Sequence, residues 1–247
     1  MGDKTQSRMH ATYGDRYARA WSFRDHWFGD ITWRYILPNY YRWTDAFLHD
    51  LPPSSIVELG AGDGEMTDII RAKGPAWSAS ITPSDVVEAG AARLRAKGYA
   101  KARQADACTT PFADDEFDVA IAYDVMHHVA DPAAMAREMV RIARKRVFLI
   151  EANGASLVRR LLELTDTYRR AGENSHLPGR YRRFFALPGV ARVEIDPLQF
   201  VPPKFLSPLT PFTIAVSEAM QHVPLLRWQC SGVRIRVTLD KGRSARP

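Results

Sequence analysis

Apolar positions in the middle of the chain fall into short continuous runs that amphipathic stretches separate. Short apolar runs between turn signals predict buried strands, and apolar residues at three- and four-residue spacing predict helices. Strands that are apolar on both faces and alternate with helices favour a parallel sheet covered by helices on both sides. The segments that predict strands are 55–60, 77–82, 102–106, 117–124 and 146–153, and those that predict helices are 64–74, 83–98, 131–144 and 156–172.

The last part of the chain has a different pattern. Residues 190–200 and 232–241 predict two more strands, and residues 211–222 predict a helix between them. In residues 232–239, GVRIRVTL, apolar and basic residues alternate, which is typical of a strand near a sheet edge. The prediction is therefore an α/β fold with a helical insert at about 155–188 before the last two strands.

Prolines and one aspartate mark the expected ends of helices and segments. Asp131 is the expected N-cap of its helix, with Pro132 at the first helical position. Pro83 is expected in the first turn of helix 83–98. The two prolines at 52 and 53 end an aromatic-rich segment. We therefore expect an N-terminal helical segment at 1–52 and a main domain at 53–247.

The composition is that of an ordinary globular protein, with 46% hydrophobic residues in 247. This is enough for the core of one α/β domain with an extension. Cys108 and Cys230 are too few for a disulfide framework and lack the spacing of metal ligands. The printed chain starts without an apolar signal core and contains no run of about 18 apolar residues. We therefore expect a cytoplasmic protein.

Positive charge is concentrated in one part of the chain. The net charge is +6, and between Arg141 and Arg183 there are 11 Lys/Arg against 4 Asp/Glu. Such an excess can attract an acidic substrate, an anionic lipid or a nucleic acid, or it can be a solvated basic face. Residues 168–185 place arginines among aromatic residues, which favours a surface that binds something flat or acidic.

The most specific local signal is the glycine-rich loop after the first expected strand, IVELGAGDGEMT at 56–67. Ligands of open parallel sheets bind at the carboxyl ends of the strands, and the start of the next helix offers free N–H groups. The three loop glycines lack the G-x-G-x-x-G spacing of a dinucleotide site. Glu58 and Asp63 oppose a polyphosphate and suit a cationic ligand, such as a sulfonium that carries an amino group.

Two stretches together resemble a known family. VELGAGDGEMT (57–67) and ADACTTPFADDEFDVAIAYDVMHHVADP (105–132) are similar to motifs of class I S-adenosylmethionine-dependent methyltransferases. The pattern is that of the ubiquinone/menaquinone-biosynthesis-like, type 11, small-molecule methyltransferases, and the resemblance covers residues 56–151. It implies a Rossmann-like, mostly parallel sheet of seven strands and S-adenosylmethionine as the cofactor.

The resemblance also implies a role for individual residues. Glu58 would lie near the amino group of the methionine part, and Asp106 would accept a hydrogen bond from the adenine. The family has an acidic residue for the ribose at the end of the second strand; the alignment places Ser80 there and puts Asp85 in the next helix. The residues expected at the cofactor are Glu58, Gly60, Ala61, Gly62, Gly64, Ser80, Asp106, Ala107, Tyr123 and Asp124, with Tyr13 and Tyr17 from the N-terminal segment.

Two histidines are the candidate catalytic residues. His127 and His128 follow the fourth expected strand, and either can act as a general base if the acceptor must lose a proton. In the family such a histidine is often structural, so this role stays open. Asp131 follows the pair, but no third ligand has suitable spacing, and we expect no metal site.

The aromatic N-terminal segment allows two interpretations. Tyr13, Tyr17 and Trp21 follow a four-residue step, which is typical of a packed helical stripe. The resemblance instead implies a lid that excludes water and shapes the substrate pocket, and aromatic faces also attract a sulfonium. The residues expected at the substrate are Trp21, His26, Trp27, Tyr181, Arg182 and Arg183.

The predicted function is methyl transfer from S-adenosylmethionine to a small molecule with an apolar or aromatic body, with an acidic or lipid-like acceptor as a further option. Two alternatives stay open: a cofactor-binding subunit without catalysis, which Ser80 favours, and a nucleic-acid methyltransferase, which only the basic region favours. Among partners we expect the small-molecule acceptor and no nucleic acid. A peripheral membrane contact is kept as an option, and the protein is expected to be a monomer or a homodimer.

Overall fold

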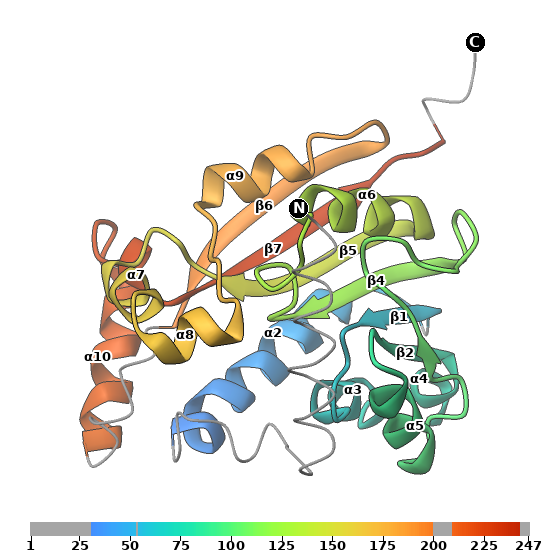
Figure 1. Cartoon of the computed structure of the whole chain (residues 1–247), viewed down its shortest axis with the longest axis horizontal. Helices are drawn as coiled ribbons and strands as arrows, with labels where there is room; N and C mark the ends of the chain where they lie inside the picture. The colour runs from blue at the N-terminus through green and yellow to red at the C-terminus, as the bar shows by residue number, and fades with distance from the viewer. Residues whose placement is uncertain (1–30, 53, 200–208, 243–247) are drawn as a thin grey trace.

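The computed structural model describes residues 31–52, 54–199 and 209–242. Its centre is a seven-stranded sheet in the order β3-β2-β1-β4-β5-β7-β6 (Figure 1). The first five strands along the chain pair in parallel, whereas β7 is antiparallel to both β5 and β6. This confirms the predicted α/β fold with a mostly parallel sheet of seven strands.

The strands and helices follow one another in an alternating order up to β5. The strands are β1 (Ile56–Leu59), β2 (Ile81–Asp85), β3 (Arg103–Gln104), β4 (Phe117–Tyr123), β5 (Ala143–Ala152), β6 (Val190–Leu198) and β7 (Gly232–Leu239). The helices are η2 (Thr32–Ile36), α2 (Leu37–Leu48), α3 (Glu65–Arg71), α4 (Pro75–Ser80), α5 (Glu88–Ala96), α6 (Pro132–Ile142), α7 (Leu157–Glu163), α8 (Asp166–Ala171), α9 (Pro178–Phe184), α10 (Thr210–His222) and η4 (Arg227–Gln229).

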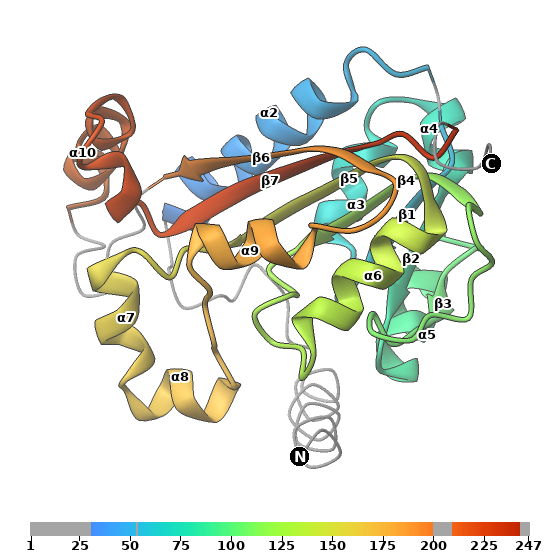
Figure 2. The same cartoon turned by 90° about the horizontal axis from the view of Figure 1, so that it is seen from above.

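Helices cover both faces of the sheet, with α2 and α3 on one side and α6 and α9 on the other (Figures 1 and 2). Each strand supplies both faces because neighbouring side chains point to opposite sides. In β4, for example, Val119 and Ile121 belong to the apolar cluster under α2, and Ala120 and Ala122 belong to the cluster under α6. The uninterrupted apolar runs of the sequence are thus explained by burial on two sides.

The described part of the predicted N-terminal segment is a packing helix. Tyr40, Trp43 and Phe47 of α2 are buried, and the Phe47 ring stacks on Phe148 of β5 at 4.6 Å between centroids. Residues 1–30 lie outside the described residues, so the lid stays a prediction. Among the helices of the described residues, none combines the length and the apolar character needed to cross a bilayer.

Three predicted elements differ clearly in their bounds: strand 77–82, helix 83–98 and helix 156–172. The expected strand 77–82 is mostly helix α4, and β2 starts only at Ile81. Pro83, expected in a helix, lies inside β2 opposite Glu58 of β1. Strand β3 pairs only with Ser84 and Asp85, so Pro83 has a strand neighbour on one side only. Its missing N–H therefore costs no hydrogen bond to β3.

The expected helix 156–172 is broken into two helices, α7 and α8, at Leu164 and Thr165. Both helices and α9 lie between β5 and β6, as the predicted insert requires.

Candidate functional site

The glycine-rich loop turns sharply at the carboxyl end of β1. Gly60, Gly62 and Gly64 have φ values of 72°, 57° and 77°, in the region that favours glycine. The Ala61 N–H donates to the Ser84 carbonyl of β2 at 2.8 Å, which holds the loop against the neighbouring strand. The loop therefore brings its backbone to the sheet edge and leads directly into α3.

Glu58 is a carboxyl group buried inside the sheet. It is 1% exposed, and its Oε2 accepts a hydrogen bond from the Thr67 hydroxyl of α3 at 2.6 Å. Burial raises the pKa of Glu58 to about 7. A cationic group beside it would favour its charged form, which fits the expected contact with an amino group.

Asp85, and not Ser80, stands at the carboxyl end of β2. The Gly62 N–H donates to Asp85 Oδ2 at 3.1 Å, and the Val87 N–H donates to Oδ1 at 2.9 Å. Ser80 instead ends α4, where its hydroxyl donates to the Trp77 carbonyl. Because Ser80 precedes β2, it lies at the opposite end of that strand, and its predicted position at the strand end is wrong.

Asp106 follows β3 at the same edge. Its Oδ1 accepts a hydrogen bond from the Cys108 N–H at 2.8 Å, and Asp106 forms an isolated bridge with Thr109. Ala107 is buried beside it. The position agrees with the expected adenine contact, which stays a prediction.

Tyr123 and Asp124 end β4 and meet α2. The Tyr123 hydroxyl and the Thr44 hydroxyl share a hydrogen bond of 2.8 Å, so this buried ring belongs to the contact between α2 and the sheet. The Tyr40 hydroxyl donates to Asp124 Oδ2 at 2.8 Å. Burial raises the pKa of Asp124 to about 6, and its φ of 54° is rare for a non-glycine residue. Asp124 is thus a strained acid at the sheet edge.

His127 lies between two carboxylates. Its Nδ1 is 2.7 Å from Glu151 Oε2 of β5, and its Nε2 is 3.1 Å from Glu173 Oε2 of the insert. Burial opposes the charged imidazolium, but Glu173 and Glu151 outweigh this and raise the pKa of His127 to about 10. The raised pKa favours the protonated ring at neutral pH, which disfavours a general base at this position, and the predicted catalytic role of His127 stays a prediction.

Glu173 lies where a third metal ligand would be needed beside His127 and His128, which the spacing of the sequence did not indicate. One ligand atom each of His127, His128 and Glu173 lies within 4.8 Å of the others. Arg159 also forms an ion pair with Glu173, and Glu151 bonds to the other ring nitrogen of His127. These groups neutralise one another without an added ion, so the geometry gives no reason to assign a metal, and the expectation of no metal site stays a prediction.

Of the predicted substrate residues, the structure describes Tyr181, Arg182 and Arg183, all on α9. Tyr181 is completely buried in the cluster under α9, and its hydroxyl donates to the Ala152 carbonyl, so a substrate contact is contradicted. Arg182 donates to the Val193 carbonyl of β6, which β7 places level with Val147 in the middle of β5. Arg183 is exposed on the same helix. Tyr13, Tyr17, Trp21, His26 and Trp27 lie outside the described residues.

The sequence did not identify several residues of the candidate site. The prediction puts Asp85 in a helix because the predicted second strand, 77–82, begins four residues before β2. Glu151 has a detectable signal, since it is an acidic residue at the end of an apolar run, and it accepts hydrogen bonds from the Val125 and Met126 N–H groups. Tyr40 and Arg159 have no local signal, because their partners are remote along the chain.

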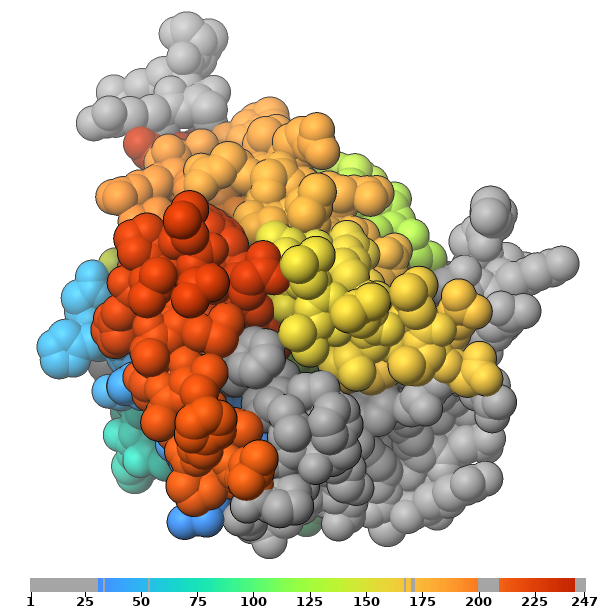
Figure 3. Space-filling model, turned by 90° about the vertical axis from the view of Figure 1, so that its left-hand side faces the viewer, coloured from blue at the N-terminus to red at the C-terminus, as the bar shows by residue number. Residues whose placement is uncertain are grey.

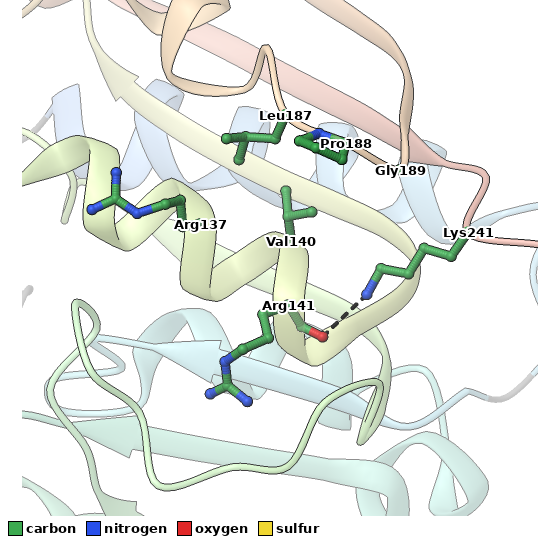
Figure 4. Close-up of a pocket in the computed structure, with 7 residues that line it drawn as sticks. All are labelled: Arg137, Val140, Arg141, Leu187, Pro188, Gly189 and Lys241. Carbon is green, nitrogen blue, oxygen red and sulfur yellow. Dashed lines mark hydrogen bonds between the residues drawn. The ribbon is translucent and has the colours of Figure 1, made fainter. Parts of the chain in front are cut away.

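A surface groove with a cavity volume of about 390 Å³ lies away from this edge (Figure 4). It lies beside the C-terminal half of α6, which leads into the start of β5. Its three cationic side chains, Arg137, Arg141 and Lys241, each form an ion pair with an aspartate. The groove therefore offers no uncompensated charge to a ligand.

Comparison with known proteins adds a family and a set of folds. Residues 57–150 match the family model described as a methyltransferase domain. A comparison with curated protein sequences finds no match. Among solved structures, a Thermotoga maritima S-adenosylmethionine-dependent methyltransferase, a possible histamine N-methyltransferase, has a TM-score of 0.63 and 19% identity, over 94% of this chain and 99% of that one.

Two further structures show how widely this fold is used. Magnesium protoporphyrin IX methyltransferase from Synechocystis, with bound S-adenosylhomocysteine, has a TM-score of 0.62 and 14% identity, over 97% of this chain and 100% of that one. The [4+2]-cyclase SpnF has a TM-score of 0.52 and 16% identity, over 82% and 81% of the two chains. At these identities the likeness shows the fold, and the reaction must be argued from the site.

Proposed function

We propose that the protein transfers the methyl group of S-adenosylmethionine to a small-molecule acceptor with an apolar or aromatic body. The chain carries a class I, type 11 methyltransferase domain at residues 57–150 and uses S-adenosylmethionine as its cofactor. The observation that carries the proposal is the set of acidic groups on successive strand ends. Glu58, Asp85, Asp106 and Asp124 belong to or follow β1, β2, β3 and β4.

The acidic groups fit the parts of the cofactor in order. Glu58 would bind the amino group of the methionine part, since a cation beside this buried carboxyl would stabilise its charged form, which burial disfavours. Asp85 would bind the ribose hydroxyls, because it stands at the carboxyl end of β2 beside the glycine-rich loop and a carboxylate oxygen can accept more than one hydrogen bond. Asp106 would accept from the adenine. This assignment replaces Ser80, and with it the feature that favoured a non-catalytic subunit.

Methyl transfer from a sulfonium requires little acid–base catalysis by the protein. S-adenosylmethionine, when bound, supplies a methyl group on an activated leaving group. The residues at the edge would then hold the acceptor in line and exclude water. Asp124 is the candidate to accept a proton from the acceptor, because it lies at the end of β4 and has a pKa of about 6.

The acceptor class is supported by the aromatic residues that surround Asp124. The rings of Tyr40 and Tyr123 lie 6.1 Å apart, and the Tyr40 hydroxyl is bonded to Asp124. An apolar or aromatic acceptor fits such surroundings better than a highly charged one. The acidic acceptor rested on Arg182 and Arg183, and their position on α9 removes that argument.

Calorimetry tests the proposal. The protein is expected to bind S-adenosylmethionine and S-adenosylhomocysteine and not NAD. Gly62→Val should abolish binding, because a branched residue cannot adopt the φ of 57° without strain. Asp85→Asn should weaken binding about tenfold through loss of charged hydrogen bonds. Ser80→Ala is the matched control and should bind normally, because the Ser80 hydroxyl bonds within α4.

Binding of NAD in preference to S-adenosylmethionine would overturn the proposal. Normal cofactor binding without transfer of labelled methyl to any member of a panel of apolar small molecules would favour the non-catalytic alternative. Thermal unfolding of each variant shows whether a loss of binding reflects loss of the fold.

A further inference from the structure

Helix α7 has its polar and apolar sides reversed. Arg159 and Glu163 face the body of the protein, with side chains only 11% and 10% exposed and an ion pair between them. The leucines Leu157, Leu161 and Leu164 are 67%, 66% and 62% exposed. Their spacing of four and three residues places them on one side of the helix. A surface helix normally buries its apolar side.

Helix α10 repeats this reversal. Its buried residues are Thr210, Thr213 and Ser217, whereas Phe212 is 67% exposed. The turn after the helix, Val223–Leu226, is exposed throughout, and Leu225 is 87% exposed. Two elements of one surface thus present large apolar side chains to the exterior.

The two elements adjoin. The Ser156 hydroxyl donates to the Gln229 carbonyl at 2.9 Å, and the Leu157 N–H donates to Gln229 Oε1 at 3.0 Å. Figure 3 shows α7 in yellow and the α10–η4 region in red side by side on this face. We call this surface the apolar face; it is defined by Leu157, Leu161, Leu164, Leu225, Leu226 and Trp228.

Two arginines border the apolar face, and Arg160 is paired with Glu163. Arg160 has a side chain 43% exposed, and the Arg227 guanidinium lies 5.7 Å from the centre of the Trp228 ring. Residues 223–229, VPLLRWQ, contain no acid, and Glu163 of α7 is already paired with Arg159 and Arg160. Arginine and tryptophan beside exposed leucines are typical of surfaces that rest at the boundary between lipid headgroups and acyl chains.

We propose that the apolar face binds the surface of an anionic lipid bilayer. A second copy of the chain fits less well, because a two-fold dimer places a surface against itself and would set Arg227 near its own copy, where residues 223–229 supply no carboxylate. Anionic headgroups supply the missing negative charge, and the acyl boundary accepts the leucines. The proposal does not depend on methyl transfer, because it concerns a surface outside the cofactor edge.

Co-sedimentation of the purified full chain with vesicles tests the proposal. The chain is expected to bind phosphatidylcholine vesicles that contain phosphatidylglycerol, and to bind pure phosphatidylcholine at least tenfold more weakly. The double variant Leu161→Gln/Leu225→Gln should weaken binding at least tenfold. Arg227→Gln should weaken it about fivefold, and added salt should do the same.

The controls match these changes elsewhere on the surface. Arg192→Gln removes one positive charge from a side chain 70% exposed on β6, and Tyr41→Gln removes an exposed aromatic side chain from α2. Both variants should bind vesicles within twofold of the unchanged protein. Brominated lipid should quench the fluorescence of the unchanged protein more than that of Trp228→Phe.

Three results would overturn the proposal. These are no binding to anionic vesicles, equal losses in the control and test variants, and a lipid-free dimer that dissociates in Leu161→Gln/Leu225→Gln. Calorimetry with S-adenosylmethionine is measured without vesicles, so the membrane proposal and the proposed function can fail separately.

Discussion

Single residues at the carboxyl edge of the sheet show how the environment decides chemical role. His127 and Asp124 are three positions apart. Two carboxylates raise the pKa of His127 to about 10, whereas burial raises the pKa of Asp124 to about 6. The sequence offered the histidine as the base because an isolated histidine titrates near neutral pH. Its carboxylate partners are Glu151 on β5, 24 residues away, and Glu173 in the insert, and no local pattern reports either of them.

The protonation of His127 gives the first prediction at this scale. Its pKa rises on folding from 6.5 to about 10, so its ion pairs stabilise the fold fully below pH 6.5 and this contribution is lost as the pH rises through about 10. In NMR titration, the His127 ring should stay protonated to at least pH 8. His127→Asn should unfold with a shallower loss of stability between pH 7 and 10, and a ring that titrates near 6.5 would contradict this picture.

At the scale of elements, helix α7 of the insert is attached to the rest of the protein by buried charge instead of by apolar packing. Helix α7 has no buried residue, but Arg159 forms ion pairs with Glu163 and Glu173, and Glu173 faces His127. The sequence predicted helical character here correctly because the leucine spacing is helical. It could not predict which side faces inward, since the usual rule buries the leucines.

Arg159 is therefore the residue on which the position of α7 and α8 depends. Arg159→Met should destabilise the protein by about 3 kcal/mol, because it leaves buried carboxylates without their cation. Arg160→Met is the matched control: its side chain is 43% exposed and pairs with the same Glu163, so its loss should cost under about 1 kcal/mol. Urea unfolding gives both values, and equal losses would show that burial of the pair does not matter.

The second strand shows why element bounds are harder to predict than element types. The run WSASIT has the apolar alternation of a strand, but Gly74 and Pro75 before it are typical of a helix start, and residues 75–80 are helical. The shift moved the strand end from Asp85 to Ser80. The predicted seventh strand and the Asp131 N-cap are confirmed, because their signals are local.

At the scale of the whole molecule, the parallel sheet explains why the glycine-rich loop also predicts where the other residues of the site lie. Parallel strands bring their carboxyl ends to one edge, so the residues after β1, β3 and β4 could be assigned to one region without knowledge of their contacts. The contribution of α2 could not be predicted, because Tyr40 and Asp124 are 84 residues apart. The same holds for the apolar face, which joins α7 to η4 across 72 residues.

Completion of the sheet depends on the last strand. β7 lies between β5 and β6 and pairs with both along most of its length. A chain that ends at Gln229 should be insoluble or unfolded, because β6 loses its neighbour in the described sheet and β5 gains an open edge. A chain that ends at Gly242 keeps every described strand and should unfold like the full protein in circular dichroism; equal solubility of the two would contradict this account.

The position of β7 also sets the order in which the protein can fold during synthesis. The ribosome releases β1 to β5 first, and the outer edge of β5 then waits for a strand some 80 positions later in the chain. β6 emerges before β7 but has no partner until β7 arrives. The nascent chain therefore carries an open, apolar strand edge until Gly232–Leu239 has been synthesised, and the native sheet forms only after that point.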